Sequence, residues 1–208
     1  MGFGEAGCPA IPVIHLIGPG GAGKSTAAPY VAALLDGSVL DLDRVFEVAH
    51  GDIDRFIRVH GYAAYAAANV EIYLERGSRS SAVAALSSGF MTYSADVHPA
   101  IAGLQRELAA APTTVLLLPS LDLEICVAET LRRQAIRPLA IRRSAGREEA
   151  VIRKRFAHYR QLTSRVVTTM RPARVVAREV VAAIKPGAAR QRRSCAPDPF
   201  PPFSPTAS

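Results

Sequence analysis

The chain has 208 residues, of which 49% are hydrophobic and 21% are charged, a composition typical of a globular protein, and its length suits one domain that buries a substantial core. No uninterrupted apolar stretch reaches the roughly 18 residues that a membrane span requires, so a transmembrane protein is not expected. The net charge of +7 leaves two interpretations, a surface that binds nucleic acid or one that handles phosphorylated ligands.

Apolar runs and helical patterns alternate along most of the chain. Five short runs predict strands: Val13–Ile17, Ser38–Leu42, Ala82–Leu86, Thr114–Leu118 and Arg165–Thr169. Helical patterns separate most of these runs, which indicates an α/β fold whose parallel sheet is covered by helices on both faces. We expect a single domain over residues 11–185, a loose leader at 1–10, and a disordered tail at 186–208 because prolines and arginines crowd it.

The segment after the first predicted strand carries the most specific motif. Residues Gly18-Pro19-Gly20-Gly21-Ala22-Gly23-Lys24-Ser25 match the pattern G-x-x-x-x-G-K-[ST], and an alanine-rich helical segment follows them. Glycines between a strand and a helix let backbone N–H groups surround phosphates, and the helix N-terminus adds positive potential. Lys24 would reach the outer phosphates, and the hydroxyl of Ser25 would face a magnesium ion. The alternative, a glycine-rich turn that binds nothing, leaves the order of the motif residues unexplained.

Two carboxylates follow the second predicted strand, in the sequence Asp41-Leu42-Asp43. Ligands of a doubly wound sheet bind beyond the carboxyl ends of its strands, and alternation along an extended chain turns both carboxylates to one side. One could hold metal-bound water, and the other could orient or deprotonate an attacking hydroxyl. A structural alternative makes Asp43 the N-cap of the next helix and Asp41 a turn residue, which does not exclude the site role.

Arginines concentrate in the charged, mostly helical segment 131–160. This segment lacks the interleaved aromatic residues on which single-stranded nucleic acids stack, so we favour a lid that clamps phosphates. Arg155 and Tyr159 lie four residues apart and therefore on one helix face. The small residues Ser87-Ser88-Gly89 at the end of the third strand would let a ligand approach the backbone, although this signal is weak alone.

Taken together, these pieces resemble the shikimate kinase family of P-loop small-molecule kinases, over about residues 13–184. The matching motifs are G-P-G-G-A-G-K-S-T at 18–26, L-D-L-D at 40–43, S-S-G at 87–89, R-P-L at 137–139 and K-R-F-A-H-Y at 154–159. The resemblance implies a P-loop NTPase-type fold with five parallel strands in the order 2-3-1-4-5, flanked by helices. It also implies a substrate-binding helical region after the second strand and a mobile lid after the fourth.

The resemblance assigns a role to each matching residue. The residues that would hold ATP are Gly20, Gly21, Ala22, Gly23, Lys24, Ser25 and Thr26, with Arg133 near the adenine. Ser25 would bind Mg²⁺ directly, and Asp41 would lie in its outer shell. Lys24, Asp43 and the lid residue Arg137 would be catalytic, with Asp43 activating the acceptor hydroxyl. The residues that would bind the acceptor are Asp43, Ser88, Gly89 and Arg155.

Two departures fall on the acceptor side. The family pattern G-E-x-x-F-R becomes Gly61-Tyr62-Ala63-Ala64-Tyr65-Ala66, so Ala66 replaces an arginine that binds substrate, and the family's triple glycine becomes Ser87-Ser88-Gly89. A charged hydrogen bond is worth roughly 1.5–3 kcal/mol, so its loss weakens the hold on a carboxylate roughly ten- to hundredfold. Arg58 could reach in instead, or Tyr62, Tyr65 and Asn69 could line a site for a less acidic polyol.

The sequence thus favours an ATP-dependent kinase that phosphorylates a hydroxyl of a small cyclic polyol or hydroxy acid, shikimate by default. The alternatives are a nucleotide-binding regulatory module without transfer activity, and a kinase for a sugar, a nucleoside or a nucleic-acid end. The expected partners are ATP and the small acceptor. No membrane partner is expected, nucleic acid is disfavoured as a partner, and the protein is expected to be a monomer or weak dimer. The three cysteines, Cys8, Cys126 and Cys195, are far apart and suit a reducing cytoplasm.

Overall fold

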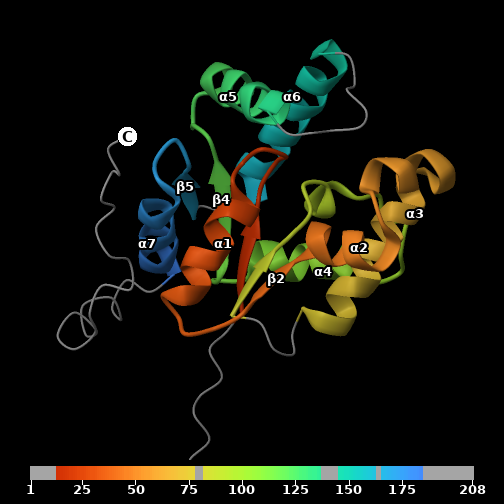
Figure 1. Cartoon of the computed structure of the whole chain (residues 1–208), viewed down its shortest axis with the longest axis horizontal. Coiled ribbons are helices and arrows are strands. Elements are labelled where there is room, and N and C mark those ends of the chain that lie inside the picture. The colour runs from red at the N-terminus through yellow and green to blue at the C-terminus, as the bar shows by residue number, and fades with distance from the viewer. Residues whose placement is uncertain (1–12, 78–81, 137–144, 163–164, 185–208) are drawn as a thin grey trace, which may run out of the picture.

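The computed structural model describes residues 13–77, 82–136, 145–162 and 165–184 (Figure 1). The elements of the first half are β1 (Ile14–Ile17), α1 (Lys24–Ala33), β2 (Val39–Asp41), α2 (Leu42–His50), α3 (Ile53–Arg76), β3 (Val83–Ala85) and the 3-10 helix η1 (Phe90–Thr92). They are followed by α4 (Ile101–Ala110), β4 (Thr114–Leu118), α5 (Leu123–Ile136), α6 (Ala145–Leu162), β5 (Val166–Thr168) and α7 (Ala173–Ile184). The predicted leader and tail, and Arg137 with its lid loop, lie outside the described residues.

The five strands form one parallel sheet in the order β2-β3-β1-β4-β5, which confirms the predicted topology. The register places Leu16 of β1 beside Ala85 of β3 and Val115 of β4. Each predicted strand contains the strand found in the structure and differs from it by at most one residue at either end. A parallel sheet of this order brings the carboxyl ends of β1, β2 and β3 to one edge, where ligands of such sheets bind.

Side chains that alternate along the strands fill two separate cores. Val115 and Leu117 of β4 pack in a cluster with α1 and α7, whereas Leu116 and Leu118 pack in a second cluster with α2, α3 and α4. Figure 1 shows α1 and α7 beside each other on one side of the sheet and α2 and α3 on the other. The apolar strands are therefore covered on both faces, as their nearly continuous hydrophobic sequences predict.

The helix α3 changes direction at Gly61, whose backbone angles (φ 83°, ψ 163°) are not helical. A φ of this sign is disfavoured for residues with a Cβ, so glycine suits this position. The bend separates the partly exposed N-terminal part of α3 from the part whose residues Tyr65, Ala66 and Val70 are buried in the core.

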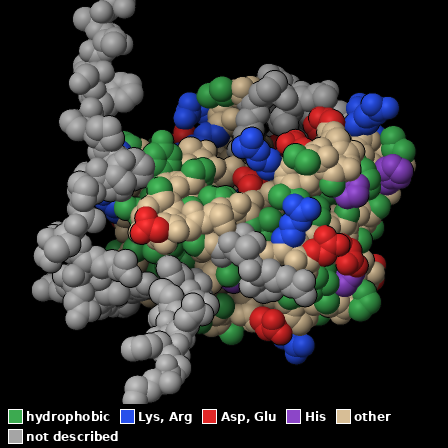
Figure 2. Space-filling model, turned by 60° about the horizontal axis from the view of Figure 1, so that its bottom comes forward, with side chains coloured by type: hydrophobic (Ala, Val, Ile, Leu, Met, Phe, Trp, Pro, Cys, Tyr) green, Lys and Arg blue, Asp and Glu red, His purple; other side chains and the backbone are tan. Residues whose placement is uncertain are grey.

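Acidic and basic side chains are interspersed on the face drawn in Figure 2, where no single basic surface stands out. In the described parts of the chain, no helix combines the length and apolar character that crossing a membrane would require. Cys126, in α5, is a buried free thiol.

Candidate active site

The loop between β1 and α1 has the geometry of a phosphate cradle. Gly18, Gly21 and Gly23 have positive φ values of 145°, 77° and 93°. A Cβ on Gly18 would lie 2.3 Å from the carbonyl oxygen of Leu117, so this turn requires glycine. The loop leads directly into the N-terminus of α1, where the N–H groups of the first turn have no carbonyl partner within the helix. This combination provides the donors that a polyphosphate needs.

Lys24 is the buried cation of this loop. Only 7% of its surface is exposed, and its Nζ donates hydrogen bonds to the carbonyl oxygens of Gly18, at 2.7 Å, and Pro19, at 3.1 Å. The ammonium group is thus held over the loop by backbone oxygens that it can exchange for phosphate oxygens. Ser25 and Thr26 follow in the first turn of α1, and both are exposed.

The structure corrects the local geometry expected at the end of the second strand. β2 ends at Asp41 and Leu42 already begins α2, so the strand alternation predicted to align Asp41 with Asp43 does not apply. Asp41, rather than Asp43, is the N-cap, because its Oδ1 accepts a hydrogen bond from the backbone N–H of Arg44 at 3.3 Å. Asp43 lies in the first turn of α2, where the helix dipole favours a carboxylate.

Asp43 is oriented by a tyrosine from another helix. The hydroxyl of Tyr65, in α3, donates to Oδ1 of Asp43 at 2.9 Å. Burial, followed by the negative charge of Asp43, raises the pKa of Tyr65 far above its usual value, so its proton stays available for this bond. Asp43 itself is only partly buried, and a bonded carboxylate of this kind can still face an acceptor hydroxyl.

The helix α6 brings a guanidinium to the small residues after β3. Nη1 of Arg155 donates to Oγ of Ser88 at 3.2 Å, and Nη2 donates to the hydroxyl of Tyr62 at 3.2 Å. The hydroxyl of Tyr159, one turn along α6 and fully buried, donates to the carbonyl oxygen of Ser88 at 3.1 Å. The predicted face of Arg155 and Tyr159 is therefore the face that contacts Ser88, and Arg155 belongs to the same site as residues 87–89.

The remaining sequence candidates on the acceptor side differ in position. Ala66 is fully buried in the core. Asn69 is also fully buried, and its amide donates to the carbonyl oxygen of Tyr65, so it does not line an open site. Arg58 is exposed on α3. Tyr93, which the sequence did not single out, lies close to Tyr62, with ring centroids 5.9 Å apart, and its hydroxyl bonds Oγ of Ser87 at 2.7 Å.

Gly89 lies directly beneath these tyrosines. A Cβ at this position would lie 2.1 Å from the hydroxyl oxygen of Tyr62 and 2.7 Å from Cε1 of the buried Tyr93. We expect Gly89→Ala to destabilise the protein by about 1–3 kcal/mol, the usual cost of overpacking, measured as the free energy of unfolding in urea. Gly103→Ala is the control, because this helical position faces open space. This substitution should raise the free energy of unfolding by about 0.5–1 kcal/mol. Equal effects of both substitutions would show that Gly89 is not constrained by packing.

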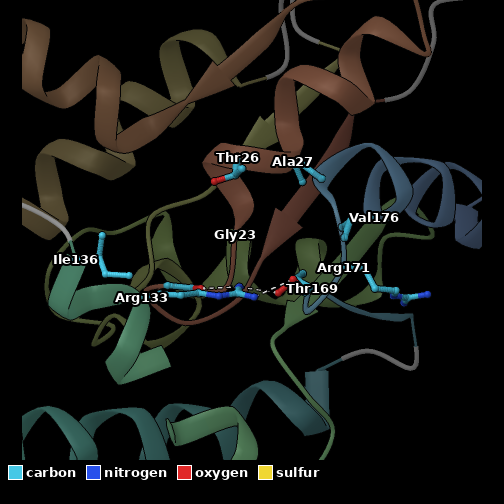
Figure 3. Close-up of a pocket in the computed structure, with 10 residues that line it drawn as sticks. Gly23, Thr26, Ala27, Arg133, Ile136, Thr169, Arg171 and Val176 are labelled. Carbon is cyan, nitrogen blue, oxygen red and sulfur yellow. Dashed lines mark hydrogen bonds between the residues drawn. The ribbon is translucent and has the colours of Figure 1, made fainter. Parts of the chain in front are cut away.

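Arg133 forms one wall of a cavity of about 370 Å³ beside the phosphate loop (Figure 3). Its Nη1 donates to the carbonyl oxygen of Gly21 at 3.1 Å and to Oγ1 of Thr169 at 2.9 Å, and its Nη2 donates to the carbonyl oxygen of Thr169 at 2.8 Å. Its Nε donates to Glu129 at 2.6 Å. Figure 3 shows the side chain of Arg133 lying along the cavity, whereas Arg171 extends away from it.

These bonds engage the N–H edges of the Arg133 guanidinium, which leaves the faces of the group without hydrogen bonds. Planar guanidinium groups stack on aromatic rings, and a nucleobase is such a ring. The cavity also contains Thr26, Ala27 and Val176, and it lies next to the phosphate loop. The geometry therefore suits the base of a nucleotide whose phosphates occupy the loop.

We expect Arg133→Lys to weaken ATP binding about tenfold, because losing a single charged hydrogen bond costs about 1.5–3 kcal/mol. The matched control is Arg132→Lys, since Arg132 bonds the same Glu129 but is an exposed neighbour without a contact to Gly21 or Thr169 in the described hydrogen bonds. Binding of a fluorescent ATP analogue measures both. A similar loss of affinity for the ATP analogue in both variants would show that the bond to Glu129, and not the contact with the cavity, matters for binding.

The two residues predicted to serve Mg²⁺, Ser25 and Asp41, both carry oxygen atoms. Mg²⁺ prefers oxygen ligands, keeps several waters, and is usually bound through one or two protein groups together with substrate phosphates. Ser25 supplies a hydroxyl at the start of α1, and Asp41 supplies a carboxylate of which one oxygen accepts from Arg44. The chemistry of this set suits Mg²⁺ held mainly by the nucleotide.

Comparisons with known proteins agree with this geometry. The family model described as shikimate kinase matches residues 20–185. A shikimate kinase of Prochlorococcus marinus is 34% identical over 83 residues, which are 39% of this chain and 44% of the relative. The pentafunctional AROM polypeptide of Clavispora lusitaniae is 34% identical over 76 residues, 36% of this chain and 5% of that protein. The chain thus matches less than half the length of these curated relatives.

Two solved structures share the fold over nearly their whole length. The shikimate kinase of Acinetobacter baumannii in complex with shikimate has a TM-score of 0.67 and 25% sequence identity, over 88% of this chain and 97% of that chain. The shikimate kinase of Aquifex aeolicus has a TM-score of 0.61 and 18% identity, over 85% of this chain and 98% of that chain.

Proposed function

The chain belongs to the shikimate kinase family, and from this premise we propose that it is an ATP-dependent kinase of small molecules in the cytoplasm. It would transfer the γ-phosphoryl group of ATP to a hydroxyl of shikimate or of a related cyclic polyol or hydroxy acid. The shikimate bound to the Acinetobacter baumannii relative supports an acceptor of this kind. The observation that supports the proposal is that the Lys24 loop follows β1 and Asp43 follows β2, two strands whose carboxyl ends lie at the same edge of the sheet with β3 between them.

Separate groups of residues would bind ATP and the acceptor. Lys24 and the loop N–H groups would hold the phosphates, and Arg133 would hold the base. Asp43, oriented by Tyr65, would accept the proton of the attacking hydroxyl, while Arg155 and Ser88 would hold the other side of the acceptor. Mg²⁺ bound near Ser25 and Asp41 would neutralise phosphate charge when present. Arg137, outside the described residues, remains our proposal for the lid arginine.

ADP release measures this activity. The protein is incubated with Mg²⁺ and ATP, with shikimate and with a panel of uncharged cyclic polyols and sugars. We expect one acceptor to stimulate the release of ADP. Light scattering should separately show a monomer or weak dimer. ATP binding without stimulation by any acceptor would instead favour the regulatory module.

The regulatory alternative has one observation in its favour. Ala66, at the position where the family carries a substrate arginine, is buried in the core, and Ser87 and Ser88 replace glycines. Against it stands the Tyr65–Asp43 bond, since a nucleotide sensor needs no oriented acceptor base. The nucleic-acid alternative rests on the net charge of +7 and predicts oligonucleotide binding that falls steeply with salt. The interspersed charges in Figure 2 do not favour it.

A further inference from the structure

Tyr62 occupies the space directly above the acceptor residues. It is the first residue after the bend at Gly61, and its side chain is 39% exposed. Its hydroxyl oxygen is so close to Gly89 that a Cβ there would lie only 2.1 Å away, and it accepts a hydrogen bond from Nη2 of Arg155 at 3.2 Å. A ligand bound against Gly89 and Arg155 would therefore also contact the hydroxyl of Tyr62.

Two of the five N–H donors of Arg155 are engaged by neutral groups. Nη1 bonds the hydroxyl of Ser88 and Nη2 bonds the hydroxyl of Tyr62. A carboxylate that took both terminal nitrogens of Arg155 in two parallel bonds would compete with the hydroxyls of Ser88 and Tyr62. An uncharged hydroxyl compound can instead bond the Tyr62 oxygen and leave the Arg155 contact in place.

The nearby helix α2 adds negative charge to this side of the molecule. Asp41, Asp43 and Glu47 lie on its first turns or at its N-cap. Burial, followed by the charges of Asp43, Asp52 and Asp41, raises the pKa of Glu47, whereas Arg44 on the same helix lowers it. The carboxylates of this region outnumber Arg44, so an anionic acceptor placed against Asp43 would be repelled, whereas an uncharged acceptor would not.

Aromatic surface surrounds the same position. The ring of Tyr62 lies 5.8 Å from that of Tyr65 and 5.9 Å from that of Tyr93, measured between centroids. Tyrosine supplies a large apolar face together with a polar hydroxyl, and such surfaces suit a ligand with an apolar ring face and hydroxyls at its edge. A cyclic polyol has this shape.

We propose that Tyr62 determines the acceptor specificity of this kinase, because its hydroxyl caps Arg155 above Gly89 and makes the site select uncharged cyclic polyols over acceptors that carry a carboxylate. This inference rests on the proposed kinase function and narrows its substrate class. It predicts that removing one oxygen atom from Tyr62 changes which acceptor is preferred, without changing how the nucleotide is held.

Equilibrium binding tests the inference separately from turnover. Shikimate, as the carboxylate probe, and myo-inositol, as the uncharged probe, are titrated by calorimetry into the full chain with Mg²⁺ and a non-hydrolysable ATP analogue. We expect the wild type to bind myo-inositol at least about tenfold more tightly than shikimate, and Tyr62→Phe to bind shikimate about tenfold more tightly than the wild type, the value of one charged hydrogen bond to Arg155. The same variant should bind myo-inositol more weakly.

The control is Tyr30→Phe, which removes the same hydroxyl from an exposed tyrosine of α1. It should leave both acceptor affinities unchanged, and both variants should keep the wild-type affinity for the ATP analogue and the wild-type melting temperature. Tighter binding of shikimate than of myo-inositol by the wild type, unchanged affinities in Tyr62→Phe, or no binding of either probe would each overturn the inference. Failure of the proposed kinase function would appear instead as absent acceptor-stimulated ADP release.

Discussion

Lys24→Ala is expected to reduce kcat for phosphoryl transfer by about 100-fold or more, the loss usually seen when one preorganised charge at a transition state is removed. The physical reason is the position of this ammonium, which is 7% exposed and held over the loop by the carbonyl oxygens of Gly18 and Pro19. Alanine removes the charge that would move onto the transferring phosphoryl group. Acceptor-stimulated ADP release measures the effect at saturating ATP.

The matched control for Lys24 is Lys154→Ala, which removes a lysine from the exposed face of α6. It should leave kcat unchanged. A melting curve of Lys24→Ala shows separately whether the loop still folds, since its two carbonyl oxygens lose their buried donor. Full turnover by a folded Lys24→Ala protein would show that Lys24 does not take part in phosphoryl transfer.

The fold could be predicted from the sequence almost completely, because each strand is a short apolar run that a parallel sheet buries on both faces. Leu116 and Leu117 are adjacent in sequence and pack in different cores, so a continuous run of leucines is what such a strand requires. The sequence predicts the ends of the strands less accurately than their positions. β2 stops at Asp41 because that side chain caps the next helix, and a cap competes locally with strand extension.

The donor side of the site follows from a local motif, whereas the acceptor side is assembled from distant segments. The glycines at 18, 21 and 23 and Lys24 act within one loop, so their spacing alone indicates their role. The contacts of Arg155 with Tyr62 and Ser88 join α6 to α3 and to the end of β3. Such contacts depend on the packing of whole helices, and the spacing of residues in the sequence does not encode them.

The same difference explains which residues the sequence missed. Tyr93 has no motif around it, and its place beside Tyr62 results from η1 and the turn that follows it. The bond of Arg133 to Thr169 spans 36 residues of sequence and holds the loop before α7 against α5. Arg133 was nevertheless expected near the adenine through the family resemblance, and it lines the cavity beside the phosphate loop. Its role in ATP binding remains a prediction.

Asp43→Asn is expected to lower kcat by about 100-fold or more while leaving the affinity for ATP unchanged, because positioned general bases usually contribute about 10²–10⁴. Asparagine has nearly the same shape and can still accept the hydrogen bond of Tyr65, which reaches Oδ1 at 2.9 Å, but it cannot take a proton. The loss should therefore fall on the chemical step. Single-turnover ADP formation separates this step from substrate binding.

Asp54→Asn is the matched control, since it also removes a carboxylate from the first turn of a helix, in this case α3. Each substitution sacrifices about 0.3–1 kcal/mol of favourable interaction with the helix dipole, so any loss of stability should be similar in the two proteins. Only the Asp43 variant should lose turnover. If Asp43→Asn retains the wild-type kcat, the attacking hydroxyl loses its proton elsewhere, and the Tyr65–Asp43 bond has a structural role at the start of α2.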